Sequence, residues 1–177
     1  MLKKMLFGLM ICLSVLVLSG CGKVYTNTDD YQDYIDLVPG SSGFMPELMD
    51  LPEYQSIEVY YYESLGQSIN LLVTFSSENY ESSKEIVLGS FEFLNAPLTE
   101  HDFFLIPEVE FEYKSFIIKV VNNDDFDYPE QFGMMGYSDE KFQISFLFFC
   151  YESLHELSNS PGRMTRFIEN EFRFPED

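Results

Sequence analysis

The chain has 177 residues and carries 30 acidic against 10 basic side chains, a formal net charge of −20. Such a charge is repelled by a phosphate backbone, so nucleic acid is excluded as a partner. The length fits one domain of ordinary size rather than two.

The first 20 residues have the organisation of a signal peptide. Lys3 and Lys4 precede an uncharged run, rich in Leu, Met, Ile and Val, that extends from Met5 to Cys21. A transmembrane helix needs about 20 apolar residues, and this run is shorter and interrupted by small residues. We therefore expect residues 1–20 to be removed on export.

The apolar run ends in Leu18-Ser19-Gly20-Cys21. This motif resembles the lipobox of bacterial lipoproteins, in which a cysteine after small residues receives a diacylglyceryl group before cleavage. The resemblance implies lipidation of Cys21 and a location on the extracytoplasmic face of the cell membrane, which becomes a partner through that lipid. Several acyl chains hold a membrane firmly, whereas one chain binds reversibly.

Cleavage also changes the charge and the cysteine content. The mature chain loses Lys3 and Lys4, which leaves eight basic against 30 acidic residues and a net charge of −22. Electrostatic attraction to anionic lipid is therefore not expected. With Cys12 removed and Cys21 lipidated, Cys150 is the only free thiol, and no intramolecular disulfide can form.

Residues 21–43 are predicted to form a lipidated N-terminus and a flexible tether, because they are polar and rich in turn-forming residues. A flexible tether of this length spans about 25–30 Å. As an alternative, the cluster of Tyr31, Tyr34 and Ile35 packs on the domain. Residues 44–177 are predicted to form the domain itself.

The first half of the predicted domain reads as a hairpin followed by a helix. Residues 45–51 form a short turn or helix, and alternating apolar and polar residues predict strands at 57–62 and 69–76 around Leu65-Gly66-Gln67. Ser76 or Ser77 then begins a helix that runs to about Leu94, with glutamates on one side.

The second half begins with strict alternation over residues 108–113 and continues into a strand at 116–121. After an acidic loop, residues 142–151 form the most apolar segment, a predicted central strand. Its alternation places Phe142, Ile144, Phe146, Phe148 and Cys150 on one face. We expect Cys150 to be buried and inert.

A closing amphipathic helix is predicted from Ser160-Pro161-Gly162, with Met164, Phe167, Ile168 and Phe172 on its apolar side. The order β-β-α-β-β-β-α predicts an α+β domain with a mainly antiparallel sheet of about five strands and two main helices, arranged in two layers.

The residues that could bind metal or catalyse lack the required partners. His101 and His155 stand in no paired histidine motif, so surface positions are expected. Residues 123–127 have oxygens at the spacing of a calcium loop, but Tyr128 and Met134 stand where such a loop needs Gly and Glu. We predict no catalytic residue, no metal site and no cofactor.

Tyr60 and Tyr62 fall on the face opposite Val59, beside Glu58. Tyrosine combines apolar area with a hydrogen-bonding tip, so Tyr60 and Tyr62 are predicted to form a contact surface. The alternative is that the second helix covers them. The expected function is non-enzymatic binding of an envelope protein or peptide.

A hydrolase built from the carboxylates of Glu58, Glu110 and Glu112 is the second functional hypothesis. It requires a deep pocket in which those groups converge.

Residues 132–137 contain two methionines between Gly133 and Gly136, the composition of a flexible binding loop or of a segment packing a sheet edge. Residues 45–54 and 132–149 resemble segments of small secreted proteins and lipoproteins of low-GC Gram-positive bacteria. That resemblance implies no activity and no site.

Overall fold

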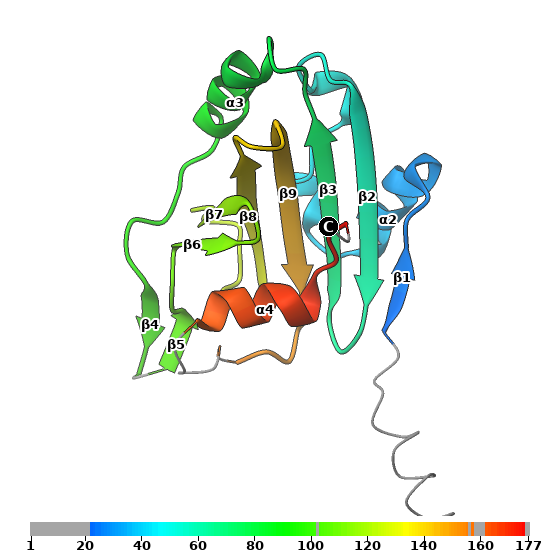
Figure 1. The fold of residues 1–177 in the computed structure, drawn as a ribbon. Helices are drawn as coiled ribbons and strands as arrows, with labels where there is room; N and C mark the ends of the chain where they lie inside the picture. The colour runs from blue at the N-terminus through cyan, green and yellow to red at the C-terminus, as the bar shows by residue number, and fades with distance from the viewer. Residues whose placement is uncertain (1–21, 102, 156, 158–161, 176–177) are drawn as a thin grey trace, which may run out of the picture.

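The computed structural model describes residues 22–101, 103–155, 157 and 162–175. The predicted signal peptide and Cys21 therefore lie outside the described residues. Seven antiparallel strands form one sheet, in the order β1-β2-β3-β9-β8-β7-β6, with a separate β4-β5 hairpin (Figure 1). The strands are β1 (Lys23–Tyr25), β2 (Ser56–Glu63), β3 (Gln67–Thr74), β4 (Leu98–Glu100), β5 (Phe103–Ile106), β6 (Glu110–Tyr113), β7 (Phe116–Val120), β8 (Gln131–Ser138) and β9 (Gln143–Cys150).

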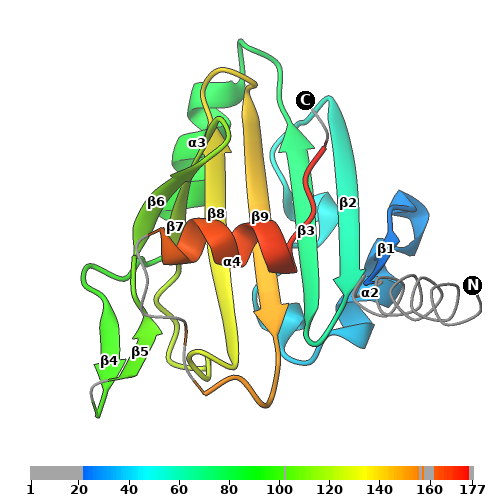
Figure 2. The same ribbon diagram turned by 60° about the horizontal axis from the view of Figure 1, so that its bottom comes forward.

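Helices lie on both faces of this sheet, as Figures 1 and 2 show. The α-helices among the described residues are α2 (Tyr31–Leu37), α3 (Tyr80–Gly89) and α4 (Arg163–Glu171), and the 3-10 turns are η1 (Thr28–Asp30), η2 (Ser41–Gly43) and η3 (Leu48–Asp50). The predicted α+β class and antiparallel sheet are confirmed. The predicted five strands, two helices and two layers differ from the structure. The described residues form a seven-stranded sheet with α2 and α3 on one face and α4 on the other, and a separate β4–β5 hairpin.

The predicted hairpin is confirmed as β2 and β3, joined by a turn at residues 64–66 and paired from Ser56 with Thr74 to Glu63 with Gln67. Its alternation divides the side chains between two cores. Val59, Ile69 and Leu71 enter one core, and Leu72 enters the other.

β9 lies between β3 and β8, as a central strand should. Ile144, Phe146, Phe148 and Cys150 share the core on one face, and Leu147 and Phe149 share the core on the other. The predicted register is therefore confirmed. The strand begins one residue late, because Phe142 occupies the preceding turn with φ 53°.

The predicted flexible tether is wrong for the described residues from Gly22 to Gly43. Tyr31, Tyr34 and Ile35 of α2 are buried in the core with Val38. The ring of Tyr34 stacks on that of Tyr61 with centroids 5.4 Å apart. The alternative, in which this cluster packs on the domain, is confirmed, so the described residues from Gly22 to Gly43 belong to the folded domain.

The closing helix α4 covers the opposite face, where Met164, Ile168 and Phe172 are buried as predicted. Residues 158–161, including Ser160 and Pro161, lie outside the described residues. Gly162 precedes the helix with φ 66°, a left-handed conformation that glycine adopts without the steric cost of a Cβ.

The helix predicted from Ser76 is shorter than expected, because α3 ends at Gly89 and the chain then joins the sheet. Phe93 forms a β-bridge with Val121, and the amide of Asn122 donates to the carbonyl of Glu92 over 2.8 Å. None of the helices formed by the described residues is long and apolar enough to cross a membrane.

Candidate functional site

Tyr60 and Tyr62 do not form an open surface. Tyr62 is only 6% exposed, with the guanidinium carbon of Arg173 lying 3.6 Å from its ring centroid. Tyr60 is half-buried, and its hydroxyl donates to a carboxylate oxygen of Glu58 over 2.7 Å. Burial, followed by that hydrogen bond, raises the pKa of Tyr60. The segment after α4, rather than the helix itself, covers Tyr62.

Polar side chains of the sheet hold that covering segment in place. The hydroxyl of Ser68 donates to the carbonyl of Glu171, and the amide nitrogen of Asn70 donates to the carbonyl of Arg173 over 2.8 Å. The amide oxygen of Asn70 accepts from Ser145 over 2.7 Å. Asn70 and Ser145 are fully buried, so these bonds close the face rather than offer it to a ligand.

The carboxylates of the hydrolase hypothesis do not converge. Glu58 lies on β2, whereas Glu110 and Glu112 lie on β6, five strand positions away in the same sheet. Five spacings of about 4.8 Å separate them by roughly 24 Å along the sheet. Glu110 is paired with Lys119 over 3.0 Å. These residues form no common pocket.

The two histidines lie on the surface, as predicted. The side chains of His101 and His155 are 88% and 83% exposed, with Glu100 at 3.9 Å and Glu130 at 3.5 Å, respectively. A hydrogen bond within the acidic loop joins the backbone amide of Asp125 to the side-chain oxygen of Asn123 over 2.9 Å. Within the described ranges, no three His, Cys, Asp or Glu side chains are placed to hold a metal ion.

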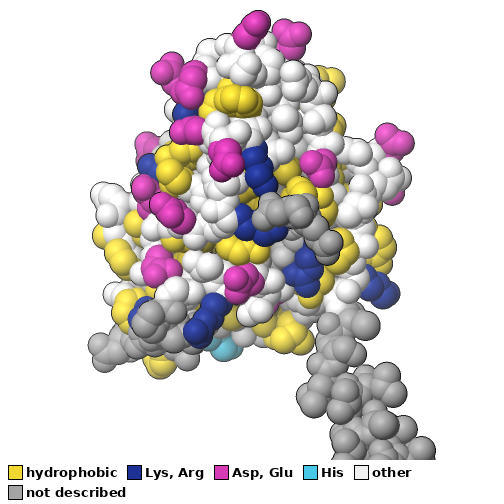
Figure 3. All heavy atoms as spheres, in the orientation of Figure 1, with side chains coloured by type: hydrophobic (Ala, Val, Ile, Leu, Met, Phe, Trp, Pro, Cys, Tyr) yellow, Lys and Arg dark blue, Asp and Glu magenta, His cyan; other side chains and the backbone are white. Residues whose placement is uncertain are grey.

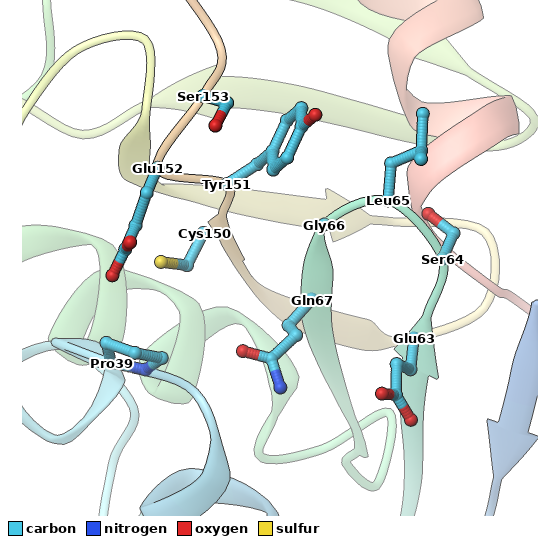
Figure 4. A pocket seen from close by; sticks show the side chains of 10 residues that line it. All are labelled: Pro39, Glu63, Ser64, Leu65, Gly66, Gln67, Cys150, Tyr151, Glu152 and Ser153. Atoms are coloured by element: carbon cyan, nitrogen blue, oxygen red, sulfur yellow. The ribbon is translucent and has the colours of Figure 1, made fainter.

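A shallow hollow of about 320 Å³ lies beside Cys150 at the ends of β3 and β9 (Figure 4). The thiol is 7% exposed and belongs to the core, as predicted. Burial raises the pKa of Cys150, and the negative charges of Glu152 and Glu130 add to the effect. A nucleophilic thiol needs the opposite setting, an electropositive one that stabilises the thiolate. This hollow is not a thiol active site.

An apolar groove of about 390 Å³ lies on the face opposite α4, between the segment around η3 and helix α3. Its lining comes from two stretches of chain and one sheet residue: Gly43, Phe44, Pro46, Asp50, Leu51, Pro52, Ile86, Val87, Ser90, Phe91 and Phe146. The rings of Phe44, Phe91 and Phe146 lie within 5.4–6.5 Å of one another, centroid to centroid. Ile86 is 64% exposed. Neither the groove nor its residues were predicted as a site.

Local hydrogen bonds organise both ends of helix α3, which forms one wall of the groove. The hydroxyl of Ser90 donates to the carbonyl of Val87 over 2.7 Å, so it serves the end of its own helix. At the other end of α3, the buried Tyr80 donates from its hydroxyl to Asp139 over 2.8 Å, and Lys84 pairs with the same carboxylate. These bonds fix α3 to the turn between β8 and β9.

Acidic residues predominate around the groove, and Lys84, the basic residue of α3, pairs with Glu81 and Asp139. Eleven acidic residues and no lysine or arginine occur from Val24 to Ser83, the stretch that forms η1, α2, η2 and η3. Asp50 lines the groove, and Glu47, Glu53 and Glu85 are exposed neighbours in the chain. On the α4 face, Figure 3 shows basic side chains near the centre, with acidic side chains around them.

Comparisons with protein-family models, with curated proteins and with solved structures found no match to this chain.

Proposed function

We propose that this protein is an exported lipoprotein, held on the extracytoplasmic face of the membrane by a diacylglyceryl group on Cys21, and that its domain binds a segment of an envelope protein without catalysing a reaction. The motif Leu18-Ser19-Gly20-Cys21 after the apolar run supports the address.

The apolar groove is the observation that carries the binding activity. Its volume of about 390 Å³ is at the lower end of the range of roughly 300–1,000 Å³ typical of ligand sites. A groove of that size accepts one or two large side chains. Its floor of three phenylalanine rings offers contact to apolar groups but few hydrogen bonds, so the preferred occupant is an aromatic or aliphatic side chain of a partner.

The charge around the groove defines the rest of the partner. Because acidic residues outnumber basic ones on the neighbouring elements, and Lys84 is paired with Glu81 and Asp139, the flanking residues of the bound segment should be basic. Such charge complementarity raises the association rate, and salt reduces this enhancement by screening the charges. The proposed ligand is therefore a cationic polypeptide segment that presents a large apolar side chain.

Synthetic peptides test this proposal directly. We expect a peptide with one Phe among lysines to bind the domain with an affinity that falls as sodium chloride rises. Replacing its Phe by Ser, or its lysines by Glu, should each remove most of the binding, because each change deletes one of the two complementary features. Calorimetric titration measures all three affinities.

Two arginine variants on α3 and its end provide the matched comparison. Ser90→Arg should weaken binding by about tenfold or more, because the long cation fills the groove and offsets its charge. Ser82→Arg makes the same change at another exposed serine that also bonds to a carbonyl three residues back, outside the groove, and should bind like the unmodified protein. Equal binding by both variants, or equal binding of the acidic peptide, would refute the groove as the site.

The proposed lipid anchor and location are tested separately. Mass spectrometry of the mature N-terminus should find a diacylglyceryl group on Cys21, and Cys21→Ser should leave uncleaved precursor or protein without the lipid. An unmodified Cys21, or cleavage at another position, contradicts the lipoprotein proposal whatever the groove binds.

A further inference from the structure

The fold leaves almost no free chain between the proposed lipid and the domain. β1 begins at Lys23, and a Cβ at Gly22 would lie 2.2 Å from the Tyr62 ring, so Gly22 already packs against the domain. Successive Cα atoms are 3.8 Å apart. A lipid on Cys21, which belongs to the proposed function and on which this inference rests, therefore holds the start of β1 within a few ångströms of the lipid headgroups.

The pairing of β1 shows which end of the domain lies beside the proposed lipid. Lys23 pairs with Glu63, the last residue of β2. Leu65 lies two residues beyond Glu63, just as Cys21 lies two residues before Lys23 in the chain. The turn between β2 and β3 and the end of β9 share this end of the sheet, since Gln67 pairs with Cys150 (Figures 1 and 2).

This end exposes large apolar side chains at two hairpin tips. Leu65, at the tip of the β2–β3 turn, is 82% exposed. Phe103, the first residue of β5, is 53% exposed, and the β4–β5 turn lies at the same end in both ribbon views. Val24 of β1 is 45% exposed. Burying apolar side chains in the membrane interface is favourable, because it removes apolar surface from water.

We infer that the end of the domain formed by the start of β1 and the β2–β3 turn rests on the outer surface of the membrane, with Leu65 in the headgroup layer. Glu63 and Glu152 line the hollow beside Leu65, and their negative charge gives no attraction to anionic lipid. The proposed contact therefore relies on the apolar side chains and does not require anionic lipid. The apolar groove, built from α3 and the segment around η3, then opens away from the bilayer.

A fluorescent probe at two positions tests this orientation in the full lipidated protein. Leu65→Cys and Ile86→Cys each introduce one exposed thiol, at the proposed membrane end and at the groove, respectively. Both are made together with Cys150→Ala so that only the new thiol is labelled. The labelled proteins are reconstituted in phosphatidylcholine vesicles with and without phosphatidylglycerol and with nitroxide-labelled lipid as quencher.

The emission of the probe at position 65 should shift to the blue when vesicles are present. The nitroxide lipid should quench this probe at least about twofold more than the probe at position 86, as expected for a group within the interface. The result should not need phosphatidylglycerol. Equal exposure of both probes to water in protein that floats with the vesicles would overturn the orientation and leave the lipid anchor standing. Protein that carries no lipid and fails to float would overturn both proposals. A blue shift at position 65 without vesicles would assign that surface to a second copy of the chain.

Discussion

The two faces of the sheet use their phenylalanine residues in different ways. On the α4 face, Phe149 contacts the rings of Phe132, Phe167 and Phe172 and is 1% exposed. On the other face, the ring of Phe91 lies against those of Phe44 and Phe146 but lines a groove open to solvent. One face is completed by the chain itself, whereas the other leaves apolar area for a partner.

The largest expected effect comes from breaking the closed face. Phe149→Ala should destabilise the domain by about 3–5 kcal/mol, because it leaves a cavity in a fully packed core. Phe91→Ala should cost about half as much or less, since solvent already reaches one side of its ring. Urea denaturation midpoints measure both. Equal losses would show that the floor of the groove is as enclosed as the core.

A smaller effect is expected at the polar bonds that hold the closing segment. Asn70→Ala leaves the Ser145 hydroxyl and the Arg173 carbonyl without their partner and should cost about 1–3 kcal/mol. It should also speed the removal of the C-terminal residues by carboxypeptidase. The exposed Asn170 on α4 serves as the control, and Asn170→Ala should change neither quantity. A stable Asn70→Ala variant with an intact C-terminus would show that aromatic packing alone closes this face.

The smallest effect concerns the wall of the groove and depends on pH. Hydrogen bonds from Lys84, and then from Tyr80, lower the pKa of Asp139. The stability contributed by a lowered carboxyl pKa is complete above the unfolded value of about 3.9 and is lost as the pH falls through the folded value. Because the Asp139 side chain is 62% exposed, the contribution should stay below about 1 kcal/mol.

Asp139→Asn removes that titration. Its unfolding midpoint should lie below that of the unmodified protein at pH 7 and approach it as the pH falls toward 3. A constant difference across this range would mean that the bonds from Tyr80 and Lys84 do not depend on the charge of Asp139.

Strict alternation made the hairpin and the central strand predictable, but β8 was missed because two glycines interrupt its pattern. Gly133 is required by packing, since a Cβ there would lie 2.9 Å from the Phe44 ring. The β-propensity of a strand does not reveal such an approach. Phe44 comes from a segment 89 positions earlier in the chain, so no local window contains both residues.

The groove escaped prediction for a related reason. It forms where the chain around Leu51 meets α3, and neither segment has a site motif of its own. Ile86 was the one sequence signal, an apolar residue next to Glu85 in the helix predicted to run to about Leu94. The end of α3 was also set by tertiary pairing, because Phe93 joins Val121 in a β-bridge and thereby ends the helical pattern.

Tyr62 lies between the two ends of the described chain, with Gly22 against its ring and Arg173 above it. The hydrogen bonds of Ser68 and Asn70 to the closing segment each span 103 residues. Contacts so distant in sequence form late, after the local hairpins. Until α4 and the segment after it dock on the sheet, Phe132 and Phe149 lack the aromatic cover that Phe167 and Phe172 supply. The docking of α4 and that segment therefore ends the stage at which the partly folded chain exposes aggregation-prone apolar surface.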